Sequence, residues 1–121
     1  MKTIIAGSRT ITSIDTIKKS IKISGFEISE VVCGGANGVD LLGKQWADSM
    51  NIPVRLFPAD WHSYGKSAGA IRNAQMGEYA DALIAVWDGK SRGTKNMIDV
   101  ANRKGLAVFV YNLRELKQKG F

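Results

Sequence analysis

The sequence has 121 residues, of which 45% are hydrophobic and 23% are charged, values typical of one globular domain spanning residues 1–121. No apolar run approaches the roughly 20 residues of a membrane span, and the run after Met1 is too short for a signal peptide, so we expect a cytoplasmic protein. The formal net charge of +6 favours an anionic partner, either a nucleotide or a nucleic acid.

Five short apolar runs predict a parallel sheet. They lie at residues 3–6, 31–33, 54–57, 82–87 and 106–111, and their starts are 23 to 28 residues apart. The runs are mostly continuous rather than alternating, which is the pattern of strands buried on both faces. Each gap has room for one crossover helix, so the sequence predicts a βαβαβαβαβ order.

The segments between these runs have helical spacing of apolar residues. Ser13 is expected to cap the first helix and Gly25 to end it. The other helices are expected over about residues 38–50, 68–79 and 94–104, with a short helix in the tail 112–121. Right-handed crossovers then give an α/β protein, a Rossmann-like three-layer α/β/α sandwich with a five-stranded parallel sheet in the order 3-2-1-4-5. This order predicts a crevice outside the carboxyl ends of the first and fourth strands.

The glycine-rich turn after the second strand is the first candidate binding element. It holds Gly34, Gly35 and Gly38, which allow a close approach of ligand to backbone. Asn37 is expected to cap the following helix, with Asp40 reaching back as in a capping box. A helix N-terminus with unpaired N–H groups suits a phosphate. The alternative is a tight turn without a ligand.

Two further turns follow the first and fourth strands. Gly7, Ser8 and Arg9 offer a glycine, a hydroxyl and a guanidinium, which suit a phosphate or a carboxylate, or else form an ordinary surface turn. The second turn opens the last crossover helix and contributes as candidate ligand contacts Asp88, Gly89, Ser91, Gly93 and Thr94. Neither the dinucleotide fingerprint nor the P-loop order is present.

The segment 57–66 is predicted to be a long loop rich in aromatic residues. Trp61 or Tyr64 can stack on a base there, although a Trp61 that only closes the end of the core is an equal alternative. The single histidine, His62, and the single cysteine, Cys33, lie in no cluster of metal-ligand spacing. We therefore expect no metal site, no cofactor and, in Cys33, an inert buried thiol.

Arg72 lies among small and apolar residues of the third expected helix. A guanidinium on such a compact helix face needs a partner. Either an internal carboxylate such as Asp81 or a ligand anion can fill that role.

These residues together resemble the SLOG superfamily, a Rossmann-like group that contains the lysine-decarboxylase-like phosphoribohydrolases and DNA-processing protein A. The resemblance covers about residues 2–110 and is to the small YspA-type family of bacteria and phages. It rests on the segments IIAGSRT, CGGANGVD, FPADWHSYGKSAGAIRNAQM and ADALIAVWDGKSRGT. It implies a Rossmann-like fold that binds a nucleotide or nucleotide-derived ligand, and a homo-oligomer, most simply a dimer.

The two branches of the superfamily imply different activities. In the phosphoribohydrolases an arginine and a glutamate serve cleavage of the N-glycosidic bond of a nucleoside monophosphate. Arg72 matches that arginine and is the candidate catalytic residue, but the glutamate position holds Met97, whose thioether cannot act as an acid or a base. The DNA-processing branch shares Gly7 to Arg9 and Gly34 to Asp40, and binds single-stranded DNA.

Three functions follow, in order of preference. The first is a sensor or sequestering module that binds a small phosphorylated ligand of AMP or ADP-ribose type. The second is a nucleoside-monophosphate phosphoribohydrolase, which Met97 disfavours. The third is a single-stranded DNA binder. The sequence supports it only weakly, because no run of basic residues interleaved with aromatic ones lies outside the segment 57–66.

Overall fold

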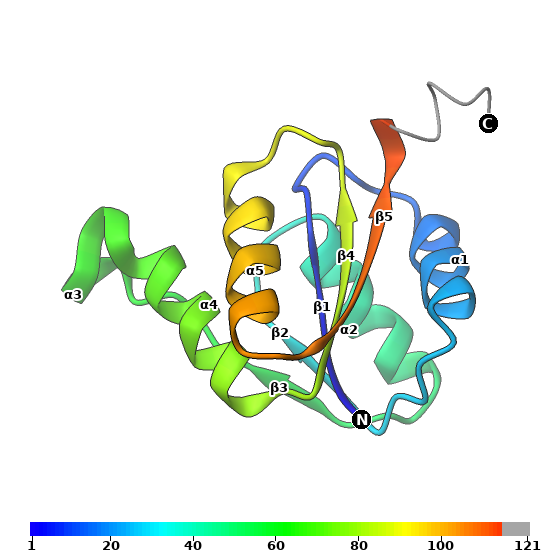
Figure 1. Ribbon diagram of the computed structural model, residues 1–121. Helices are drawn as coiled ribbons and strands as arrows, with labels where there is room; N and C mark the ends of the chain where they lie inside the picture. The colour runs from blue at the N-terminus through cyan, green and yellow to red at the C-terminus, as the bar shows by residue number, and fades with distance from the viewer. Residues whose placement is uncertain (115–121) are drawn as a thin grey trace.

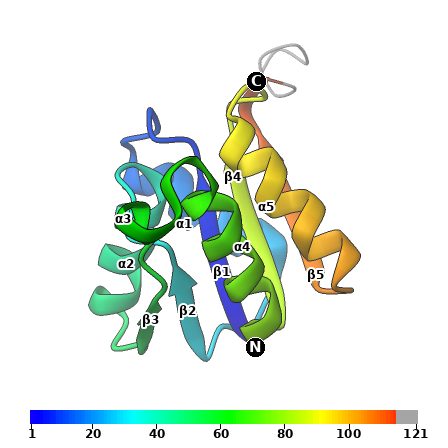
Figure 2. The same ribbon diagram turned by 90° about the vertical axis from the view of Figure 1, so that its left-hand side faces the viewer.

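The computed structural model describes residues 1–114, with an open parallel sheet at the centre of the molecule (Figure 1). The sheet has five strands, in the order β3-β2-β1-β4-β5, and all neighbouring strands pair in parallel. Figure 2 shows them in this order from left to right. The strands are β1 (Lys2–Gly7), β2 (Glu30–Cys33), β3 (Val54–Leu56), β4 (Ala82–Trp87) and β5 (Ala107–Asn112). The predicted fold class and strand order are confirmed.

The apolar runs form the strands because the central ones are covered on both faces. All but the end residues of β1 are buried, and five consecutive residues of β4 are buried, from Ala82 to Val86. Side chains on one face of the sheet pack with Met76 and Met97 of the helices, and those on the other face pack with Ile17 and Val39. Two apolar layers therefore hold the sheet, as continuous rather than alternating hydrophobicity predicts.

Helices cover both faces of the sheet and complete the three layers (Figures 1 and 2). One face carries α4 and α5, and the other carries α1 and α2. The helices longer than one turn are α1 (Ile14–Ser24), α2 (Val39–Ser49), α4 (Ala68–Tyr79) and α5 (Arg92–Arg103). No helix in the described part of the chain is long and apolar enough to cross a membrane.

The ends of α1 and α5 follow the expected capping chemistry. Ser13 accepts a hydrogen bond from the Thr16 N–H at 3.4 Å, and Gly25 ends α1 in the left-handed region with φ of 70°. Helix α5 begins two residues earlier than predicted, because Ser91 caps it and accepts a hydrogen bond from the Thr94 N–H at 3.3 Å.

The expected capping box at α2 is wrong. Gly38, not Asn37, is the N-cap residue, and no side chain caps this helix. Gly38 has φ of 76°, and a Cβ there would lie 2.6 Å from the Cα of Arg9. Close packing against the loop after β1 therefore sets the start of α2, and Asp40 bonds elsewhere.

The segment between β3 and α4 is more ordered than the predicted loop. It contains one turn of helix, α3 (Trp61–Tyr64), and a 3₁₀ turn, η1 (Gly65–Ser67). Asp60 caps α3 by accepting a hydrogen bond from the Ser63 N–H at 3.1 Å. No residue of α3 or η1 is buried, and Figure 1 shows α3 projecting beyond the N-terminal end of α4. The expected tail helix lies, from residue 115 onward, outside the described residues.

Candidate functional site

A cavity of about 370 Å³ opens at the carboxyl ends of the strands, the upper edge of the sheet in Figure 1. Its walls come from the end of β1, the N-terminal parts of α2, α4 and α5, and Trp61 of α3. A second hollow, also about 370 Å³, lies beside it over the glycine turn after β2. The two share as lining residues Arg9, Ala36, Trp61 and Arg72. The switch point of the sheet therefore carries the crevice that the strand order predicts.

The glycine turn is held from both sides by charged side chains. One carboxylate oxygen of Asp40, Oδ2, accepts hydrogen bonds from the N–H groups of Gly34 at 3.2 Å and Ala36 at 3.3 Å. The carbonyl of Gly34 accepts a hydrogen bond from Arg72 Nη1 at 2.9 Å. A Cβ on Gly34 would lie 2.0 Å from that nitrogen, so any side chain there would displace the guanidinium.

Arg72 continues this chain of hydrogen bonds toward α5. Its Nε donates to Asn73 Oδ1 at 3.1 Å, and Asn73 Nδ2 donates to Asn96 Oδ1 at 2.9 Å and to the Gly93 carbonyl at 3.3 Å. Asn73 is only 6% exposed, and both ends of its amide are bonded. Hydrogen bonds thus link the glycine turn, α4 and the first turn of α5, and they orient the guanidinium before any ligand binds.

The internal partner expected for Arg72 is a backbone carbonyl and an amide rather than Asp81. The Asp81 carboxylate accepts a hydrogen bond from the Lys2 N–H at 2.9 Å, at the start of β1. It therefore lies at the opposite edge of the sheet from the cavity. Among the described residues no hydrogen bond from Arg72 Nη2 is found, and Arg72 lines both the cavity and the hollow.

The cavity is strongly positive. The cationic side chains that line it are Arg9, Lys66, Arg72 and Arg92. Among its described lining residues Asp40 is the only acid, and it is 6% exposed. Burial raises the pKa of Asp40 above its ordinary value of 3.8. The hydrogen bond from the Ala36 N–H and the charge of Arg72 lower this pKa, but burial has the larger effect. Four cations around one shielded carboxylate favour an anionic ligand.

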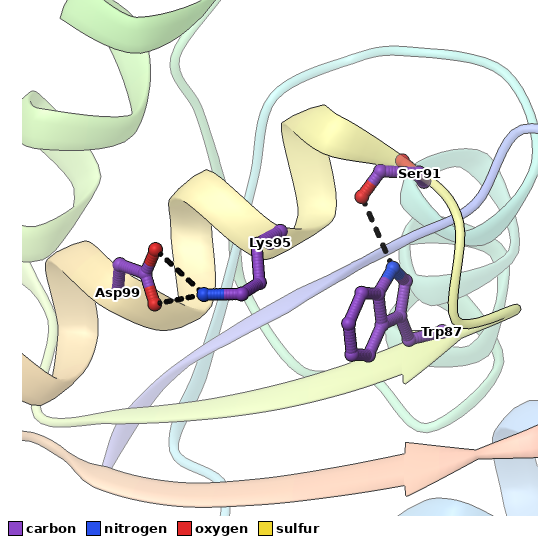
Figure 3. A network of polar contacts seen from close by, with 4 residues as sticks. All are labelled: Trp87, Ser91, Lys95 and Asp99. Carbon is purple, nitrogen blue, oxygen red and sulfur yellow. Dashed lines mark hydrogen bonds and ion pairs between the residues drawn. The ribbon is translucent and has the colours of Figure 1, made fainter.

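The N-terminus of α5 is held in place from the sheet side. Trp87 Nε1 donates a hydrogen bond to the Ser91 carbonyl at 3.0 Å, and Figure 3 shows the indole reaching from the end of β4 to the start of the helix. Further along α5, Lys95 and Asp99 form an exposed ion pair at 2.8 Å, away from the cavity lining. The first turn, with Gly93 and Thr94, therefore faces the cavity as a fixed element.

The turn after β4 uses Asp88 to hold its own shape. Asp88 Oδ1 accepts hydrogen bonds from the N–H groups of Lys90 at 2.8 Å and Ser91 at 2.9 Å, and these bonds lower the pKa of Asp88. The Asp88 N–H donates to the buried hydroxyl oxygen of Ser8 at 3.1 Å. The Ser8 side chain thereby joins the turns after β1 and β4.

Residues 1–64 match the family described as YspA, cpYpsA-related SLOG family. The chain belongs to this SLOG family. The match ends before α4, so it covers the glycine turn and the loop after β1 but neither Arg72 nor the start of α5. The expected resemblance is confirmed, and SLOG membership is consistent with a nucleotide-related ligand.

A phage protein is similar to most of the chain. The "Gene 61 protein" of Mycobacterium phage D29 is 37% identical over 84 residues, which cover 64% of this chain and 67% of the phage protein. No solved structure matches the chain. The family assignment therefore rests on sequence, and the fold on the sheet described above.

The SLOG structure brings most of the predicted site residues to the cavity or to the hollow beside it. Those that line the cavity are Gly7, Arg9, Asp40, Arg72, Ser91, Gly93 and Thr94. Those that line the hollow, besides Arg9 and Arg72, are Gly34, Gly35 and Asn37. The predicted residues that line neither are Ser8, Gly38, Asp88 and Gly89. Asp88 lines a separate cavity near the start of α1, with Lys90.

The lining residues that the sequence did not single out include Lys66, Gly69 and Asn96. Gly69 lies three residues before Arg72, and Asn96 lies three residues after Gly93, so each pair shares a helix face. Helical spacing from Arg72 and Gly93 was therefore the signal that would have found Gly69 and Asn96, whereas Lys66 lies in the 3₁₀ turn and has no such signal. Within residues 1–114 no group of three His, Cys, Asp or Glu side chains is placed to hold a metal ion.

Proposed function

We propose that the cavity binds a small phosphorylated ligand of AMP or ADP-ribose type, and that the protein acts as a sensor or sequestering module. The observation that carries this proposal is the convergence of four cationic side chains around one cavity at the switch point of the sheet. SLOG membership agrees with it. The ordered guanidinium of Arg72 gives the site a fixed anion-binding group, which lowers the entropic cost of binding.

The phosphate is best accommodated at the first turn of α5. Arg92 and Gly93 line the cavity there, and the first N–H groups of a helix suit an anion. The start of α2 is less suited, because Gly38 packs against the loop after β1 and lines neither the cavity nor the hollow. A longer ligand can extend past Arg9 into the hollow, which supports the inclusion of ADP-ribose.

The second candidate is hydrolysis of the N-glycosidic bond of a nucleoside monophosphate. One observation favours it: Asp40 is a carboxylate with a raised pKa in the cavity wall, a property common among acid–base groups. Two observations oppose it. Asp40 Oδ2 is already bonded to two backbone N–H groups. Met97, which lines the cavity, stands at the glutamate position of the phosphoribohydrolases, and its thioether cannot act as an acid or a base.

The test compares binding with base release. Calorimetry measures the affinity of the wild type and of Arg72→Ala for AMP, ADP-ribose and a single-stranded oligonucleotide, the last at two salt concentrations. Arg103→Ala is the matched control, because it removes the same charge from an exposed position in the last turn of α5. We expect Arg72→Ala to weaken AMP binding about 10- to 150-fold, the value of one charged hydrogen bond, and Arg103→Ala to leave it unchanged.

Base release from AMP separates the candidate functions. We expect negligible release by the wild type and by Arg72→Ala, and Met97→Glu tests whether a carboxylate at that position supplies activity. Rapid release by the wild type would replace the binding proposal with the enzyme. Oligonucleotide binding with a steep salt dependence and without AMP binding would identify a DNA-binding protein. Light scattering on the same samples checks the expected dimer.

A further inference from the structure

Trp61 is largely exposed and does not belong to either apolar layer of the core. Its side chain is 54% exposed, and it belongs to the single-turn helix α3, in which no residue is buried. The other two tryptophans, Trp46 and Trp87, are partly buried and pack against the two apolar layers. The alternative in which Trp61 closes the end of the core is therefore wrong.

The position of Trp61 relates it to the site instead. It lines both the cavity and the hollow beside it, so it stands at their junction together with Arg9 and Arg72. Tyr64, on the same turn of helix, is 52% exposed but lines neither. Of two equally exposed aromatic side chains, only Trp61 borders the cationic cavity.

Gly69, in the first turn of α4, leaves space beside the indole. A Cβ on Gly69 would lie 3.6 Å from Cη2 of Trp61, an ordinary contact, and it would meet nothing else within 4 Å. Gly69 has no positive φ, so neither backbone conformation nor packing requires a glycine there. A glycine in a helix costs stability relative to alanine. What this glycine provides in return is open space at the edge of the indole.

We propose that Trp61 and Gly69 form the subsite for a nucleobase, which stacks on the indole while the phosphate lies among the arginine side chains. This inference rests on the proposed function and adds a requirement for a planar aromatic group in the ligand. Indole and base faces attract each other whichever base is present, so the subsite favours nucleotides over phosphorylated sugars. Selection between bases is left to hydrogen-bonding groups of the cavity.

The experiment compares AMP with ribose 5-phosphate, which keeps the phosphate and lacks the base. We expect Trp61→Ala to weaken AMP binding roughly 5- to 150-fold, the range for loss of one stacked base, and to leave ribose 5-phosphate binding unchanged. Trp61→Phe should retain most of the AMP affinity. Tyr64→Ala is the matched control and should leave both ligands unaffected. AMP should quench the tryptophan fluorescence of the wild type, and this quenching should be smaller in Trp61→Ala. Ribose 5-phosphate should quench the two proteins equally.

Each contrary result has a distinct meaning. An unchanged AMP affinity in Trp61→Ala, or an equal loss for AMP and ribose 5-phosphate, would overturn the base subsite while leaving the phosphate site intact. A fall in molar mass by light scattering for both Trp61→Ala and Tyr64→Ala, without an effect specific to AMP, would make α3 a contact between copies of the chain. If the wild type binds neither ligand, the proposed function itself fails and the subsite with it.

Discussion

Substituting Gly93 by alanine separates the stability of the protein from its ligand binding. Gly93 is the second residue of α5 and lines the cavity. It has no positive φ, and a Cβ there would meet nothing within 4 Å. Gly69 and Gly93 are the two described glycines that lack both a positive φ and a close neighbour, and both lie in first turns of helices beside the cavity.

Gly93→Ala should therefore stabilise the free protein. Replacing glycine by alanine in a helix gains up to about 1 kcal/mol, and about 0.5–1 kcal/mol is reasonable near the helix start. Unfolding entropy for 121 residues is about 0.25 kcal/mol/K, so the midpoint of thermal unfolding should rise by about 2–4 °C. The added methyl group takes the space through which a phosphate reaches the first N–H groups of α5. We expect AMP binding to weaken at least about tenfold, or about 1.4 kcal/mol.

Circular dichroism gives the unfolding midpoint and calorimetry the AMP affinity of the same samples. Gly77→Ala is the control, because its Cβ would lie 2.8 Å from Cγ1 of Val100 in the helix layer. That variant should lose stability by about 1–3 kcal/mol through overpacking and bind AMP normally. A Gly93→Ala protein that is more stable and binds AMP like the wild type would refute the assignment of the phosphate to this turn. One that is less stable would refute the claim that the position is open.

Two other predictions concern buried titratable groups. Burial raises the pKa of Asp40, so its contribution to stability is present at low pH and is lost as pH rises through the raised value. Asp40→Asn keeps an oxygen that can accept from the Gly34 and Ala36 N–H groups. Its free energy of unfolding relative to wild type should therefore increase as the pH rises above the ordinary carboxyl pKa of 3.8, and urea unfolding that shows no pH-dependent difference would contradict this. Burial, with the Asp40 charge, raises the pKa of Cys33 to about 11 at 1% exposure, so a thiol reagent should label it only after unfolding. Labelling of the folded protein at the rate of a free thiol would disprove that expectation.

The fold was predictable because its signals are local and repeated. The bounds of α4 and β4 agree with the predicted ranges 68–79 and 82–87, since continuous apolar runs and helical spacing define them. The single turn α3 was missed, because four residues are too few to show a helical period. The partner of Asp40 was also missed. The carboxylate does reach back, but to the N–H groups of Gly34 and Ala36 rather than to that of Asn37, and Gly38 is the N-cap residue.

The site was predictable to the level of its loops but not of its side chains. Parallel strands bring the turns after β1, β2 and β4 to one edge of the sheet, as the topology requires. Which way a residue faces is decided by hydrogen bonds within each turn. Asp88 and Ser91 are three residues apart, yet Ser91 lines the cationic cavity, while Asp88 turns toward the start of α1 and holds the N–H groups of its own turn.

Local features that cost stability gather at this one cavity, and their coincidence favours it as the proposed binding site. A tryptophan that is more than half exposed, a glycine in a helix with no structural need for it and a buried carboxylate each oppose the ordinary preferences of a folded chain. Any one of these features by itself also occurs in proteins for structural reasons alone. Here Trp61, Gly93 and Asp40 come from α3, α5 and α2 and meet in a space lined by four cations. Departures from local consistency that converge from separate elements are expected at functional sites, where binding compensates for the stability that they cost. Loss of AMP affinity in both Gly93→Ala and Trp61→Ala would show that the α5 and α3 sides of the cavity act on one ligand.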